Sequence, residues 1–326
     1  MRERPLAGTA RLEDGPEGDG RGPAEGSDDG DAGAVSEAAR RTRDGVLVWR
    51  IASAFIAFLV ALLVFWVGIP LLAPAYLVLV LIGVQELYSM LALRGIRVRR
   101  WSLWVAAVLT LPASLPPSYP GMPALTDGMS WRELLFGLFA LFLIGLEVVH
   151  PKRDSLNTIV YSLFAYLYIP WLLGYIVTLR YTPDGRLGLW YLTLPMLAIF
   201  ASDVGAYAVG SWLGRRRLAP LISPNKTVEG SLGGLVLSVV VVAAATSVLE
   251  HFAHLHVDLY DGLLFSLLVG SAAQLGDLFE SLVKRWVGVK DAGFFLPGHG
   301  GVLDRIDSTL FAVPITYYFV TLVILR

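Results

Sequence analysis

Nine long apolar runs, separated by short polar connections, constrain the fold of this 326-residue chain more than any other feature. A helix that crosses a membrane needs about 20 predominantly apolar residues. The runs cover residues 49–67, 69–93, 101–117, 132–149, 155–178, 188–213, 230–249, 259–284 and 307–325, and the third is the weakest because prolines end it early. The sequence therefore predicts an all-α, polytopic integral membrane protein with about nine transmembrane helices.

The composition supports this class of protein. Hydrophobic residues make up 55% of the chain, charged residues only 16%, and the mean hydropathy is +0.62. The net charge of −1 argues against a basic nucleic-acid-binding protein. The absence of cysteine excludes disulfides, thiolate metal sites and cysteine nucleophiles.

The chain divides into three regions by composition. Residues 1–44 contain 11 acidic residues, 7 arginines and 8 glycines, and they cannot bury enough apolar surface to offset the entropy of ordering. We expect a disordered, acidic, glycine-rich cytoplasmic tail there. We expect residues 45–200 to form apolar helices suited to support, dimerisation or lipid contact, and residues 201–326 to form the functional region, because the polar motifs described below lie there.

The basic residues near the ends of the runs predict an orientation. Eighteen lysines and arginines lie in the segment 40–50 or at and after the ends of the second, fourth, sixth and eighth runs, and only four lie at the opposite ends. Cytoplasmic connections carry such an excess of positive charge. The sequence thus predicts a multi-pass protein of the cell membrane, with its N-terminus and its polar motifs in the cytoplasm and its C-terminus outside.

Intramembrane polar residues concentrate in the last four runs, which contain Asp203, Gln274, Asp277 and Glu280. A carboxylate within an apolar helix is costly and usually marks a functional site, although an interhelical hydrogen bond is the simpler alternative. Positions 277, 280, 281 and 284 form one stripe at helical spacing. An ion-pair network explains Glu280 and Lys284 well, but it explains Asp277 less well.

The connection at 223–230 reads SPNKTVEG. Ser223 and Thr227 are suited to cap a helix start, and Lys226 would lie beside helix N–H groups that favour a phosphate. The spacing of a Walker A loop is absent. A phosphate site is one interpretation of this segment, and positive charge at a helix end is the other.

The connection before the last run is rich in glycine, at positions 293, 298, 300 and 301, which permits close approach of a ligand to the backbone. Asp304, Asp307 and Ser308 follow on one helical face. A helix cap alone does not require two aspartates and a serine. Carboxylates that converge from separate helices bind hard cations such as Mg²⁺, which often bridge to substrate phosphates.

These segments carry a family resemblance. The sequence reads SLVKR at 281–285, KDAG at 290–293 and LPGHGGVLDRID at 296–307, preceded by SDVGAY at 202–207 and SPNKTVEGSLGG at 223–234. This pattern resembles the signature of CDP-diacylglycerol synthases, also called phosphatidate cytidylyltransferases. The match covers about residues 200–308 and does not include the acidic tail.

The resemblance implies a membrane enzyme of phospholipid biosynthesis, which forms CDP-diacylglycerol and pyrophosphate from CTP and phosphatidate. It implies Mg²⁺, with a second cation such as K⁺ in some members, and a homodimer within the lipid bilayer. The metal ligands would come from Asp277, Asp304, Asp307, Asp203 and Asp291, of which Asp277, Asp304 and Asp307 are also the expected catalytic residues together with Lys226. Substrate phosphates and the nucleotide would contact Lys226, Ser223, Lys284, Arg285, Lys290, His299, Arg305 and Asp203.

Two alternatives stay open at this point. A cation-coupled transporter would use Asp203 and Asp277 as ion sites, but such proteins often contain repeated halves, and this sequence has no evident repeat. Another CTP-using lipid enzyme, such as a prenol kinase or an archaeal-type CDP-lipid synthase, would use the same motifs on a different lipid.

Overall fold

A computed structural model describes residues 56, 58–125, 129–253, 257–293 and 300–325. The chain separates into two units, Met1–Ile56 and Ala57–Arg326, and the helices and strands reported below belong to the second. The tail expected at 1–44 and the first part of the first apolar run, residues 49–55, lie outside the described residues.

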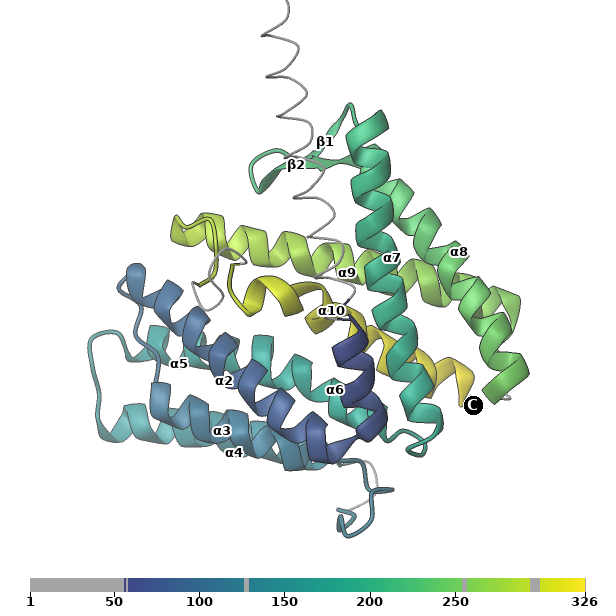
Figure 1. Cartoon of the computed structure of the whole chain (residues 1–326). Coiled ribbons are helices and arrows are strands. Elements are labelled where there is room, and N and C mark those ends of the chain that lie inside the picture. The colour runs from purple at the N-terminus through teal and green to yellow at the C-terminus, as the bar shows by residue number, and fades with distance from the viewer. Residues whose placement is uncertain (1–55, 57, 126–128, 254–256, 294–299, 326) are drawn as a thin grey trace, which may run out of the picture. The chain divides into compact units, whose positions relative to one another are not determined.

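The second unit is built almost entirely from helices (Figure 1). A short helix, Phe58–Val67, precedes the labelled elements. The labelled helices are α2 (Ile69–Leu93), α3 (Arg100–Ala113), α4 (Trp131–Val149), α5 (Ser155–Tyr166), α6 (Leu172–Arg180), α7 (Leu187–Leu213), α8 (Val228–Ala253), α9 (Leu259–Val287) and α10 (Leu303–Phe319). The π-helical segments η1 (Leu167–Trp171) and η2 (Val320–Ile324) join α5 to α6 and extend α10, and the strands are β1 (Arg217–Ala219) and β2 (Ser223–Thr227).

Six helical segments of the described chain are long and apolar enough to cross a membrane. They are Ile69–Leu93, Ser155–Arg180, Leu187–Leu213, Val228–His251, Leu259–Val287 and Leu303–Ile324. The expected all-α, multi-pass architecture is confirmed, but nine spans are not. Helix α3 has only 14 residues, and α4 carries three charged residues within 19. The first expected span is described only in its second half.

The polar helices form two close pairs. Helix α7 packs along α8, and α9 packs along α10 (Figure 1). Glycines allow this proximity: a Cβ atom on Gly205 of α7 would lie 2.7 Å from the carbonyl oxygen of Gly233 in α8. A Cβ atom on Gly276 of α9 would lie 2.5 Å from the carbonyl oxygen of Asp307 in α10. Small residues at interfaces let membrane helices approach closely, so Asp203 and Asp277 come near the neighbouring helices.

The segment between α7 and α8 folds as an antiparallel hairpin, with Arg217 opposite Thr227 and Ala219 opposite Ser223. Ser223 therefore lies in a strand and does not cap a helix, which corrects one sequence-based expectation. Thr227 does cap α8, because its Oγ1 accepts from the Gly230 N–H at 3.1 Å. The Glu229 carboxylate accepts from the N–H groups of Arg215 and Arg216 and ties the start of the hairpin to α8.

In the N-terminal helices, the buried side chain of Arg132 bonds to the π-helical segment η1. Arg132 of α4 donates to the carbonyl oxygen of Trp171 at 2.5 Å, and Tyr76 donates to that of Pro170 at 3.0 Å. These bonds tie the π-helical segment to α4 and α2, and the centroid of the Tyr175 ring lies 3.9 Å from the Arg132 guanidinium carbon.

Candidate active site

A cavity of about 460 Å³ lies between α7, the hairpin, α8 and α9. Four of the residues expected at the site contribute to its wall: Asp203, Ser223, Lys226 and Asp277. The other lining residues are Ser202, Ala206, Tyr207, Gly210, Ser211, Leu218, Asn225, Thr227, Gly230, Ser231 and Gln274. Its volume is within the usual range for a small-molecule site.

Lys226 and Asp277 form an ion pair in this cavity. Lys226 comes from β2, and Asp277 comes from the inner part of α9. Their side chains are 32% and 33% exposed, so both remain accessible to a ligand. The charges of Asp277 and Lys226 also act on Asp203, which approaches from α7. The cavity thus combines two carboxylates with one ammonium group.

Gln274 holds the three helices around the cavity together. Its Nε2 donates to Ser202 Oγ of α7 at 3.2 Å and to the Ser231 carbonyl oxygen of α8 at 3.0 Å. Its Oε1 accepts from the Ser231 hydroxyl. An intramembrane amide with these three bonds fixes the spacing of α7, α8 and α9 beside Asp277.

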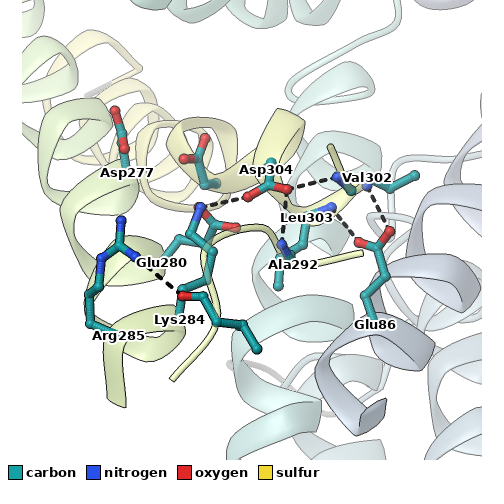
Figure 2. A network of polar contacts seen from close by, with 12 residues as sticks. Glu86, Asp277, Glu280, Lys284, Arg285, Ala292, Val302, Leu303 and Asp304 are labelled. Carbon is teal, nitrogen blue, oxygen red and sulfur yellow. Dashed lines mark hydrogen bonds and ion pairs between the residues drawn. The ribbon is translucent and has the colours of Figure 1, made fainter. Parts of the chain in front are cut away.

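A second charged centre, more buried than the first, lies between α9 and α10. Lys284 donates to Glu280 at 2.7 Å and to Asp304 Oδ1 at 2.6 Å. The side chains are largely buried, at 12% exposed for Lys284, 2% for Glu280 and 15% for Asp304. The i,i+4 pair expected from the sequence is confirmed, and it includes Asp304 as a further partner (Figure 2).

The other oxygen of Asp304 binds the backbone of the connection before α10. Oδ2 accepts from the N–H groups of Ala292 at 3.1 Å and Gly301 at 2.7 Å. Asp304 therefore joins three parts of the chain: α9 through Lys284, the loop at 292, and the residues that lead into α10.

Asp307 lies between the two centres. It is buried, its Oδ1 accepts from the Ser308 N–H at 2.5 Å, and its charge interacts with those of Asp277 and Asp203. It is not part of the cavity lining. The structure arranges the acidic residues expected at the site as an open centre at Asp277, a closed centre at Asp304, and Asp307 between them.

The remaining expected site residues lie at the surface or outside the described chain. Arg285, Lys290, Asp291 and Arg305 are exposed. Arg285 donates to the carbonyl oxygens of Ile222 at 3.3 Å and Val289 at 3.4 Å, which links the hairpin to the end of α9. His299 lies outside the described residues.

Sequence reasoning did not assign a site role to Glu86 of α2. Its carboxylate is buried and accepts from the N–H groups of Val302 at 2.9 Å and Leu303 at 2.8 Å, at the start of α10 (Figure 2). The available signal was a lone carboxylate in an apolar run, which is rarely without function.

The oxygen donors suit a hard cation, although the described residues contain no ready-made cluster of three His, Asp or Glu side chains. Mg²⁺ is usually held by one or two carboxylates together with substrate phosphates and water. Asp277 and Asp203 face the cavity and could share such an ion with a nucleotide. Asp304 keeps acceptor capacity on Oδ1, because a carboxylate offers about four lone-pair sites.

Comparison with known proteins agrees with the family resemblance of the sequence motifs. The model of a family described as the cytidylyltransferase family matches residues 48–323. A protein of Bacillus subtilis (strain 168) named phosphatidate cytidylyltransferase is 34% identical over 250 residues, covering 76% of this chain and 89% of the relative. Proteins of the same name from Synechocystis and Staphylococcus epidermidis are 34% and 33% identical, covering 84% and 82% of this chain and 97% and 96% of the relatives.

Proposed function

This chain belongs to the cytidylyltransferase family, and on that premise we propose that it is a phosphatidate cytidylyltransferase. It transfers CMP from CTP to phosphatidate and forms CDP-diacylglycerol and pyrophosphate. The observation that carries the proposal is the similarity to relatives of that name over most of both chains. The cavity that holds Lys226, Asp203 and Asp277 gives the reaction a place.

The reaction needs positioning and charge compensation more than it needs an enzyme nucleophile. A phosphate oxygen of phosphatidate attacks the α-phosphorus of CTP, a new P–O bond forms, and the bond to the β-phosphate breaks to release pyrophosphate. Lys226 is suited to bind the triphosphate, because its ammonium group lies in the cavity and is accessible. Ser223 and Asn225 add polar groups to the same wall.

We propose that the reaction uses Mg²⁺, with a second cation such as K⁺ as a further possibility. Asp277, Asp203, Asp304 and Asp307 are the carboxylates that would hold it, whereas Asp291 is exposed in the loop between α9 and α10. Bound Mg²⁺ neutralises charge on transferring phosphates. In the structure, the Lys226 ammonium group pairs with the Asp277 carboxylate.

We propose that the enzyme lies in the cell membrane with the cavity at the cytoplasmic side, where CTP is found. The excess of basic residues at the connections on this side supports that orientation. The short helices Phe58–Val67, α3 and α4 would complete nine spans and place the C-terminus outside. We further expect a homodimer in the bilayer, as the family resemblance implies.

Purified protein in detergent–phosphatidate micelles, supplied with Mg²⁺ and CTP labelled at the α-phosphate, tests the proposal. The expected products are labelled CDP-diacylglycerol and unlabelled pyrophosphate, with no product in EDTA. CTP labelled at the γ-phosphate should give labelled pyrophosphate and no labelled lipid.

Parallel reactions separate the alternatives. A polyprenol that accepts the γ-phosphate would identify a prenol kinase, and preference for an isoprenoid ether-linked phosphatidic acid would identify an archaeal-type CDP-lipid synthase. Absence of CMP transfer to any phosphorylated lipid by well-folded protein would contradict the proposed function.

A further inference from the structure

We infer that Glu86 of α2 is a positioning residue for the reaction: it holds the start of α10 and, through it, the orientation of Asp304. This inference rests on the proposed function and deepens it. Glu86 belongs to the apolar N-terminal helices, which carry none of the family motifs quoted above, and it is not part of the cavity lining.

The contact is specific and joins residues more than 200 positions apart. Oε1 of Glu86 accepts from the Val302 N–H at 2.9 Å, and Oε2 accepts from the Leu303 N–H at 2.8 Å. The first N–H groups of a helix have no partner within the helix, and a carboxylate is the acceptor that its dipole favours. Glu86 is thus the N-terminal cap of α10, supplied by another helix.

Two glycines of the signature make room for this carboxylate. A Cβ atom on Gly293 would lie 2.5 Å from Glu86 Oε1, and a Cβ atom on Gly301 would lie 2.8 Å from each carboxylate oxygen. Real Cβ atoms do not approach this closely. The sequence suggested that these glycines admit a ligand, but the group they admit in the structure is a side chain of the protein itself.

The cap also bears on where the phosphates bind. A glycine-rich connection that leads into a helix is an ordinary anion site. Here carboxylates occupy the donors: Asp304 takes the Gly301 N–H, and Glu86 takes the next two. A triphosphate at this position would meet two negative charges, which directs it to Lys226 in the cavity.

Glu86 and Lys284 constrain Asp304 from opposite sides (Figure 2). Lys284 binds one carboxylate oxygen directly, and Glu86 fixes the two residues that precede Asp304. Loss of the Glu86 bonds frees Val302 and Leu303 and lets Asp304 and Asp307 shift with the helix start. A displacement of about 1 Å in catalytic groups can reduce turnover about 100-fold.

The matched control is Glu147, another buried glutamate in the N-terminal helices. It accepts from Arg99 Nε at 2.5 Å and from the Ser155 hydroxyl at 2.6 Å, and it is not part of the cavity lining. Glu86→Gln and Glu147→Gln make the same chemical change. Only the first replaces one of the two acceptor oxygens at the start of α10 by an amide N–H group, which cannot accept.

The experiment compares both variants with the wild-type enzyme by hydrogen–deuterium exchange and by kinetics. Glu86→Gln should increase exchange in peptides that cover residues 300–308, without substrate. It should lower kcat about 100-fold, raise the Mg²⁺ concentration needed for half-maximal activity, and leave the KM for CTP within about threefold. Glu147→Gln should leave all these quantities at wild-type values for the folded fraction.

A Glu86→Gln enzyme with wild-type exchange at 300–308, or with wild-type kcat, would overturn the inference. An inactive wild-type enzyme would instead contradict the proposed function, and the exchange result would still test the cap. A change in the Mg²⁺ requirement cannot come from a smaller folded fraction, so it separates positioning from general destabilisation.

Gly301→Ala keeps the test possible if Glu86→Gln does not fold. The added methyl group would collide with the Glu86 carboxylate, so this variant should show the same local exchange and the same fall in kcat. In a Glu86→Ala background, the added methyl group has room, and Gly301→Ala should have little further effect on exchange or kcat. Equal effects of Gly301→Ala in both backgrounds would show that the glycine does not serve Glu86.

Discussion

The molecule contains two lysine–aspartate pairs of the same chemistry in different environments. Lys226 and Asp277 meet in the cavity, with about a third of each side chain exposed. Lys284 and Asp304 meet between α9 and α10, where Glu280 and backbone N–H groups complete the bonding. The first pair can exchange its partners for a ligand, whereas the second is fixed by its surroundings.

This difference separates activity from stability. A solvent-accessible ion pair contributes about 0–1 kcal/mol to folding, because water screens it and ordering the side chains costs entropy. Removal of one partner from a buried pair costs about 3–5 kcal/mol, because the other charge is left uncompensated. Changes at the open centre should therefore lower activity with little loss of stability, whereas changes at the closed centre should also destabilise the α9–α10 contact.

The largest effect on activity is expected for Asp277→Asn at the open centre. The substitution keeps the shape of the side chain but removes a charge that would hold the cation, an interaction worth several kcal/mol in the transition state. Activity should fall about 1,000-fold with little change in melting temperature. Turnover of the purified variant above about a tenth of the wild-type rate would show that Asp277 holds no essential cation.

Lys226→Met should have the next largest effect on activity. It removes the ammonium group that faces the proposed triphosphate, and a charged hydrogen bond to phosphate is worth about 1.5–3 kcal/mol. We expect kcat/KM for CTP to fall about 10- to 100-fold, with the melting temperature in detergent nearly unchanged. An unchanged KM and kcat for CTP would place the triphosphate elsewhere.

Lys284→Met makes the same substitution at the closed centre and, unlike Lys226→Met, should lower the stability of the protein. Glu280 and Asp304 would be left as two buried carboxylates without their common partner, which should cost about 3–5 kcal/mol of stability. Thermal unfolding in detergent measures this loss, and the combination of Lys284→Met with Glu280→Gln should recover part of it. A Lys284→Met enzyme as stable as Lys226→Met would remove the distinction between the centres.

Arg285→Ala should have the smallest effect. Arg285 is exposed and bonds only to backbone carbonyls of the hairpin and the end of α9 among the contacts described above. Loss of one exposed hydrogen bond should change stability by less than about 1 kcal/mol and the KM for CTP by less than about threefold. A larger rise in KM would assign Arg285 to the open centre as a phosphate ligand, as the sequence suggested.

The sequence by itself determined the class of the protein and the composition of its site. Twenty-residue apolar runs can bury their backbone polar groups in a bilayer only as helices, so the all-α membrane fold followed from hydropathy. The i,i+4 spacing fixed the Glu280–Lys284 pair, because neighbours on one helix face depend only on helical geometry. The motifs at 202–207, 223–234, 281–285, 290–293 and 296–307 indicated the family by resemblance.

Only the tertiary structure decided which of these charged groups are open and which are closed. Asp277 and Asp304 look equivalent in the sequence, but burial depends on how α7, α8, α9 and α10 pack, and no local pattern encodes that packing. The role of Glu86 depends on a contact across 216 positions. An N–H group at a helix start can donate to an acceptor from any element that reaches it, so spacing along the chain could not reveal that α2 supplies the cap.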